Sequence, residues 1–122
     1  MSDKKILVVD DEPHLVRSLT FVLEKAGYIV SSASNGEEAL SEVKESKPDL
    51  MFLDVMIPKK NGYEVCEEIK KTPALKDIYI IIMTAIGQES HREKGIKAGA
   101  NEFITKPFSP MEIVTRARKL LG

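Results

Sequence analysis

Four short, mostly apolar runs recur along the chain, and each leads into an acid, a hydroxyl or an amine. The runs cover residues 6–9, 50–53, 78–83 and 103–105, and the polar residues that follow them are Asp10-Asp11, Asp54, Thr84 and Lys106. Runs of this length that are rich in Ile, Val and Leu, separated by longer polar stretches with helical spacing, are typical of buried parallel strands joined by helices. The pattern therefore favours an open α/β sheet.

The polar residues at the ends of these runs should lie close together in the folded chain. All strands of a parallel sheet have their carboxyl ends at one edge, and ligands bind at this edge in open α/β folds. Acids, a hydroxyl and an ammonium that are far apart in the sequence would then meet in one crevice.

The remaining segments complete a regular alternation of strands and helices. One further strand is expected at 28–33, and the strand that contains the 103–105 run is expected to begin at 101. Helices are expected to begin near Pro13, Gly36, Gly62, Gly87 and Pro110. Residues 87–98 have almost no apolar stripe, so we expect this helix to be exposed and weakly held. Five strands that alternate with five helices predict a doubly wound α/β fold.

Length and composition predict one cytoplasmic domain that covers residues 1–122. The 43% hydrophobic and 30% charged content is typical of globular domains, and the net charge of -1 gives no general attraction to nucleic acid or anionic lipid. The longest apolar run, 78–83, is too short to span a membrane, and the N-terminus shows no signal-peptide pattern. Cys66, the single cysteine, cannot form an internal disulfide and is expected to be a buried apolar residue.

The three aspartates at the strand ends predict a magnesium site. Asp10, Asp11 and Asp54 would place up to three negative charges in a confined space, which is unfavourable unless protons or a cation offset them. Mg²⁺ prefers oxygen ligands and keeps several waters, so a few carboxylates and one backbone carbonyl suffice. Zinc and copper are disfavoured because no His or Cys lies near these strand ends.

The same residues suit phosphoryl transfer. A carboxylate beside Mg²⁺ can attack phosphorus in line and form an acyl phosphate, and such a reaction needs mainly positioning and charge neutralisation. Asp54 would be the nucleophile. Lys106 and Thr84 would contact oxygens of the phosphoryl group as a point charge and a hydrogen-bond donor.

These motifs give the chain a family resemblance. The stretches ILVVDDE, LDVMIPKKNG, MTA and KPF occur in this order at the expected strand ends. Together they resemble the receiver domain of two-component response regulators, such as the chemotaxis regulators, over essentially all 122 residues. The resemblance implies a flavodoxin-like (βα)5 fold whose five-stranded parallel sheet has the order 2-1-3-4-5, with helices on both faces.

The resemblance also implies a role for each site residue. Asp54 accepts a phosphoryl group from a sensor histidine kinase or a histidine phosphotransfer protein, in a Mg²⁺-dependent reaction that the receiver itself catalyses. The expected metal ligands are Asp10, Asp11, Asp54 and the backbone carbonyl of Met56. Thr84 and Lys106 contact the phosphoryl group, and the Lys106–Pro107 peptide bond is usually cis in the family. Such a chain is a signalling module rather than an enzyme acting on an external substrate.

In the family, phosphorylation acts through a switch that Thr84 and Phe103 match here. The hydroxyl residue moves toward the phosphoryl group and the aromatic residue turns inward, which changes the face formed by the fourth helix, fifth strand and fifth helix. This face would regulate a partner protein or an attached effector, and relatives often pair through it as homodimers. Met56 and Ile86 match positions that tune water access, and because both are bulky and apolar we predict a long-lived acyl phosphate.

Three other interpretations fit the residues less well. A phosphatase of the haloacid dehalogenase type needs two aspartates in one DxD motif and a cap, whereas Asp10 and Asp11 are adjacent and Asp54 lies on another strand. A flavin or nucleotide carrier would need a glycine-rich phosphate loop. A phosphorylation-independent receiver would normally have lost one of the site residues. The motifs do not specify the cognate kinase, the output, the oligomeric state or whether the chain belongs to a longer regulator.

Overall fold

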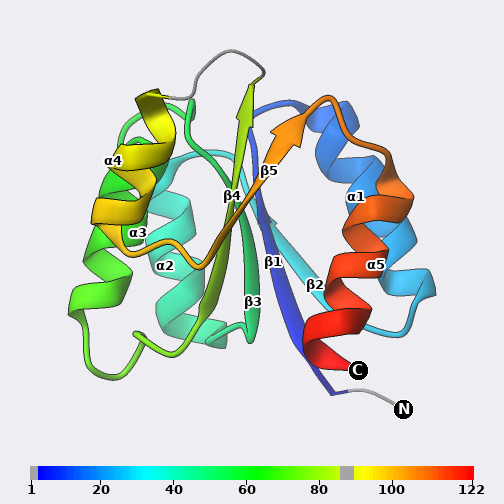
Figure 1. The fold of residues 1–122 in the computed structure, drawn as a ribbon. Helices are drawn as coiled ribbons and strands as arrows, with labels where there is room; N and C mark the ends of the chain where they lie inside the picture. Colours follow the sequence, from blue (N-terminus) through cyan, green and yellow to red (C-terminus); the bar gives the residue numbers. More distant parts are fainter. Residues whose placement is uncertain (1–2, 86–89) are drawn as a thin grey trace.

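The protein folds into one parallel sheet with helices on both of its faces (Figure 1). The structure, a computed structural model, describes residues 3–85 and 90–122. Within these segments the sheet has the order β2-β1-β3-β4-β5, which confirms the predicted topology. The elements are β1 (Lys5–Val9), α1 (Pro13–Lys25), β2 (Ile29–Ala33), α2 (Gly36–Ser46), β3 (Leu50–Asp54), α3 (Gly62–Lys71), β4 (Tyr79–Ala85), α4 (Ser90–Ala98), β5 (Glu102–Lys106) and α5 (Pro110–Leu121).

The sheet separates two apolar layers. Helices α1 and α5 cover one face and α2, α3 and α4 cover the other (Figure 1). Strand β1 contributes to both layers, because successive side chains of a strand point to opposite faces. Ile6 and Val8 pack beneath α1 and α5, while Leu7 and Val9 pack beneath α2, α3 and α4. Burial on both faces explains why this strand is a continuous apolar run rather than an alternating one.

Most helix ends follow from local chemistry. Pro13 begins α1, and Gly27 follows its end with a φ of 103°, a conformation that glycine adopts without steric cost. Ser109 caps α5 as predicted, since its hydroxyl accepts from the Glu112 N–H and the Glu112 carboxylate accepts from the Ser109 N–H. Asn61 and Glu64 form the same reciprocal pair at the start of α3, directly after the loop that follows Asp54.

The helix predicted at residues 87–98 is described from Ser90, and residues 87–89 lie outside the described part of the chain. Ile96 is exposed, as expected for a helix without an apolar stripe. The helix is nevertheless anchored on the sheet and on α3, because Gly95 lies against the Phe103 ring and the Ala98 carbonyl accepts a hydrogen bond from the Cys66 thiol. Cys66 is fully buried, as predicted.

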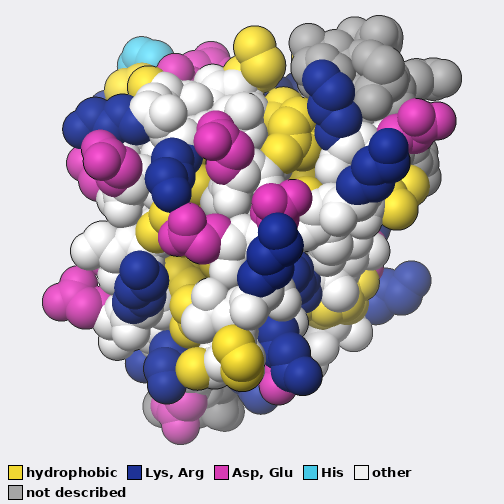
Figure 2. Space-filling model, turned by 90° about the vertical axis from the view of Figure 1, so that its left-hand side faces the viewer, with side chains coloured by type: hydrophobic (Ala, Val, Ile, Leu, Met, Phe, Trp, Pro, Cys, Tyr) yellow, Lys and Arg dark blue, Asp and Glu magenta, His cyan; other side chains and the backbone are white. Residues whose placement is uncertain are grey.

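The surface over α3 and α4 mixes charges of both signs. Figure 2 shows Lys and Arg side chains interspersed with Asp and Glu on this side of the molecule. On and beside α3, Lys60 and Lys71 form ion pairs with Glu68 and Glu67, respectively. Such a pattern is typical of a solvated helix surface. Among the helices that the structure describes, none combines the length and the apolar character that a membrane crossing requires.

Candidate metal centre at the carboxyl edge of the sheet

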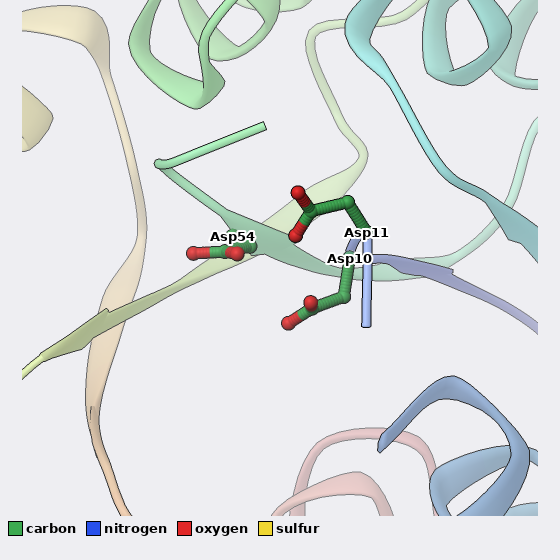
Figure 3. Close-up of side chains that lie close together, drawn as sticks. All are labelled: Asp10, Asp11 and Asp54. Atoms are coloured by element: carbon green, nitrogen blue, oxygen red, sulfur yellow. The ribbon is translucent and has the colours of Figure 1, made fainter. Parts of the chain in front are cut away.

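Three aspartates meet where the carboxyl ends of β1 and β3 lie side by side (Figure 3). The register pairs Val9 with Leu53, so the residues that follow them, Asp10 and Asp54, are neighbours at the same edge. Asp11 comes next in the chain, and one carboxylate oxygen from each aspartate lies within 4.8 Å of the other two. This confirms the expected convergence of the acids, at the carboxyl edge of the parallel sheet.

Asp10 is held in place from two directions. Its side chain is buried, with 1% of the residue exposed. One carboxylate oxygen accepts a hydrogen bond from the backbone N–H of Glu12 at 3.0 Å, and the other accepts from the Lys106 Nζ at 2.8 Å. The first bond ties the carboxylate to the start of α1, and the second ties it to the end of β5. Asp10 therefore has one preferred orientation before any ligand arrives.

Lys106 joins the acids of β1 and β3. Its Nζ lies 2.8 Å from Asp10 Oδ2, 3.5 Å from Asp54 Oδ2 and 3.9 Å from Glu12 Oε2. Burial disfavours the ammonium form, but the hydrogen bond to Asp10 and the negative charge of Asp54 outweigh it and raise the pKa of Lys106. The lysine is therefore a cation at neutral pH, as the sequence interpretation requires.

Asp54 offers one oxygen to the backbone and one to the lysine. Its Oδ1 accepts from the Met56 N–H at 3.3 Å, and its Oδ2 faces Lys106. Burial raises the pKa of Asp54, the nearby Asp10 carboxylate raises it further, and Lys106 offsets only part of this effect. The pocket is thus more negative than its single lysine neutralises.

The donor set fits Mg²⁺. Three carboxylates and one ammonium carry a net negative charge, and the clustered ligand atoms are all oxygens. Among the side chains that the structure describes, those of residues 3–85 and 93–122, this is the one group of three or more acidic, histidine or cysteine side chains close enough to share an ion. A bound divalent cation would offset the negative charge of Asp10, Asp11 and Asp54, and it would favour the ionised form of Asp54, which burial disfavours.

The structure describes most of the other predicted site residues. Thr84 is half-buried in β4, directly after Met83, which is the register partner of Asp54. Phe103 is half-buried in β5 on the side of α4. The Met56 side chain is exposed beside Asp54. The Lys106–Pro107 bond is cis, as the resemblance implies. Ile86 lies outside the described residues.

Sequence reasoning missed two features of the site. The first is the bond from the Glu12 N–H to Asp10, although an aspartate often accepts from the N–H two residues later, so the signal was present. The second is the close packing of Gly62 on the Asp54–Val55 peptide. A Cβ at Gly62 would lie 2.6 Å from the Asp54 carbonyl oxygen and 2.7 Å from the Val55 Cα. The start of α3 can approach the acid loop this closely only with glycine there.

Comparison with known proteins identifies one family over most of the chain. The model of the response regulator receiver domain matches residues 6–118. The chain is 44% identical over 119 residues to the alkaline phosphatase synthesis transcriptional regulatory protein PhoP of Bacillus subtilis, a match that covers 98% of this chain and 49% of that protein. The chain therefore spans about half the length of this curated relative.

Solved structures show the same similarity in three dimensions. The chemotaxis response regulator CheY4 of Vibrio cholerae matches with a TM-score of 0.91 and 27% identity, covering 98% of this chain and 100% of that one. The signal receiver domain of a signal transduction histidine kinase from Syntrophus aciditrophicus matches with a TM-score of 0.89 and 32% identity, covering 97% and 89% of the two chains.

Proposed function

The chain belongs to the family of response regulator receiver domains, and on this premise we propose that residues 1–122 form one receiver that is switched by phosphorylation of Asp54. Receiver domains are signalling modules of two-component systems rather than enzymes with an external substrate. The observation that carries the proposal is the pocket itself. Asp54 is buried, with 6% of the residue exposed, and its carboxylate lies 3.5 Å from the Lys106 ammonium. It shares its crevice with Asp10 and Asp11.

In this proposal each residue has a defined task. An Asp54 oxygen forms a bond to phosphorus while the bond from phosphorus to the donor histidine nitrogen breaks, and the electron pair of that bond stays on the imidazole. Bound Mg²⁺ would neutralise charge on the transferred group and on the carboxylates. Asp10, Asp11, Asp54 and the Met56 carbonyl would hold it. Lys106 and Thr84 would contact the remaining phosphoryl oxygens.

The position of Lys106 supports the role proposed for it. In the described state it bridges Asp10 and Asp54, so it occupies the pocket as an internal cation. A phosphoryl group on Asp54 would offer the lysine new anionic oxygens a short distance from its present partners. Contacts of Lys106 and Thr84 with those oxygens would bias a two-state equilibrium, in which Phe103 changes position and the surface of α4, β5 and α5 changes with it.

The partners follow from the same proposal. The donor would be a sensor histidine kinase or a histidine phosphotransfer protein in the cytoplasm. The changed α4, β5 and α5 surface would regulate a partner protein, an attached effector or a second copy of the chain. The Bacillus relative is a transcriptional regulatory protein about twice as long as this chain, so in a longer protein we would expect the DNA contacts outside the receiver.

Acetyl phosphate tests the proposal without the cognate kinase. The wild type and Asp54→Ala are incubated with acetyl phosphate and Mg²⁺, and intact masses are measured. Asp49→Ala is a matched control, because Asp49 precedes β3 at the opposite edge of the sheet and contacts Lys5 there. We expect one phosphoryl group on the wild type and on Asp49→Ala and none on Asp54→Ala. Label on both the wild type and Asp54→Ala, or on neither, would contradict the proposal.

A further inference from the structure

The loop of residues 55–61 connects Asp54 to α3 and contains Met56. It packs on the first turn of α2. The Gly36 N–H donates to the Pro58 carbonyl at 3.2 Å. This N–H is one of the first four in α2 and has no acceptor within the helix, so the loop satisfies it. Gly36 is buried, which places the contact away from solvent. A helix remote in sequence from the acids therefore contacts the loop directly.

The contact is too close for any residue other than glycine. A Cβ at position 36 would overlap the Lys60 carbonyl oxygen and lie 2.5 Å from the Lys60 Cβ. Because an ordinary carbon–carbon contact needs about 3.5 Å, the loop or the helix would have to retreat by roughly 1 Å. The crowding involves backbone atoms, so a rotamer change alone cannot relieve it.

The rest of the loop has little freedom to absorb that shift. At its start it is packed against Gly62, and at its end Lys60 is paired with Glu68 on α3 at 2.9 Å. Lys59 has a φ of 71°, which is unusual for a residue with a side chain. Its pair with Glu37 on α2, at 3.3 Å, is exposed and adds little restraint. A displacement at Lys60 would therefore be passed back along the loop toward Met56.

We propose that Gly36 is a positioning residue for the magnesium site, acting through the 55–61 loop on the Met56 carbonyl. The inference rests on the proposed function, since it assumes that the acids and this carbonyl hold Mg²⁺. The ion demands nearly ideal octahedral geometry, so it tolerates a misplaced ligand poorly. Residues that orient metal ligands typically change metal affinity by about 10- to 100-fold when they are substituted.

Gly36→Ala provides the test, with Mg²⁺ binding to the unphosphorylated protein measured by calorimetry. We expect the dissociation constant to rise about 10-fold or more. Gly27→Ala is the matched control. This variant should lose stability through backbone strain, because Gly27 has a φ of 103°. Gly27 lies at the opposite edge of the sheet, and an added Cβ there would have open space around it. Glu37→Ala removes the exposed pair with Lys59 and leaves the Gly36 contact intact.

The outcomes separate this inference from the proposed function. Weakened binding in Gly36→Ala, with both controls within about twofold of the wild type, supports the positioning role. Unchanged binding in Gly36→Ala, or equal weakening in Gly27→Ala, overturns it. A wild type that binds no Mg²⁺ and takes no label from acetyl phosphate contradicts the proposed function instead.

A measurement on the wild type decides the matter if Gly36→Ala does not fold. If the loop couples Gly36 to the site, Mg²⁺ must stabilise the bond from the Gly36 N–H to Pro58 by linkage. Hydrogen exchange of the Gly36 amide should then slow at saturating Mg²⁺. The Gly27 amide, which donates to the Glu24 carbonyl at 3.0 Å, should be unaffected. Equal exchange of the Gly36 amide with and without Mg²⁺ would overturn the inference.

Discussion

Gly95→Ala should destabilise the protein through one aromatic ring. A Cβ on Gly95 would overlap the Cε2 of Phe103 and lie 2.7 Å from its Cζ and 3.3 Å from the Ile82 Cδ1. The ring packs against the core between the sheet and α2, α3 and α4, so it can avoid the new methyl group only by giving up part of that packing. Either the ring or α4 must move.

Two opposing effects set the change in the free energy of unfolding that Gly95→Ala causes. Alanine is better than glycine inside a helix by about 1 kcal/mol. Forcing an extra methyl group into a packed site typically costs about 1–3 kcal/mol, and an overlap with a ring held by the core belongs near the upper end. We therefore expect a net loss of roughly 1–2 kcal/mol in the wild-type background. In Phe103→Leu the atoms Cε2 and Cζ are absent, so there the same substitution should stabilise by up to about 1 kcal/mol.

Urea unfolding of the wild type, the two single variants and the double variant measures this coupling. The change of sign corresponds to a coupling energy of about 1–3 kcal/mol between positions 95 and 103. Ile96→Ala is the control on the same helix, because Ile96 is exposed and should not couple to Phe103. Additivity of Gly95→Ala and Phe103→Leu within about 0.5 kcal/mol would refute the claim that the ring excludes a side chain at position 95.

Three further predictions concern Asp54, Cys66 and Met56. Burial, and then Asp10, raise the pKa of Asp54, so its ionised form opposes folding above the ordinary aspartate pKa and has no such effect below it. Without Mg²⁺, Asp54→Asn should therefore resist urea better than the wild type at pH 7. An advantage of the variant that grows toward acid pH would contradict this. Burial raises the pKa of Cys66 to about 11, so a thiol reagent at pH 8 should label it only after unfolding, and rapid labelling of the native protein would show the buried placement to be wrong. Met56→Asn should shorten the lifetime of the acyl phosphate measured by intact mass, because it replaces a bulky apolar side chain two residues after Asp54. An unchanged lifetime would count against a role for Met56 in excluding water.

Local chemistry explains why much of the fold was predictable. Pro13 and Ser109 mark helix starts through interactions within one turn, and the apolar runs mark strands that are buried on both faces. The strand bounds were less predictable. Thr84 was expected to follow its strand, but it lies within β4, because its pairing with Thr105 continues the ladder toward β5. Such pairing depends on another strand, so no local pattern reports it.

The sequence by itself determined the alternation of strands and helices, and with it the edge at which Asp10, Asp11, Asp54 and Lys106 meet. These conclusions need only the period of the apolar residues and the common direction of parallel strands. The tertiary structure decided which groups touch. Lys106 pairs most closely with Asp10, 96 positions away, rather than with Asp54, the proposed nucleophile.

The two glycine contacts were likewise decided by the tertiary structure. Gly36 meets Lys60, and Gly95 meets Phe103, through close approaches of elements that the sequence does not align. Distances of this kind depend on how whole helices pack on the sheet and on neighbouring loops, to within a fraction of an ångström. A glycine in the sequence shows that a side chain is absent, whereas the folded protein shows what occupies its space.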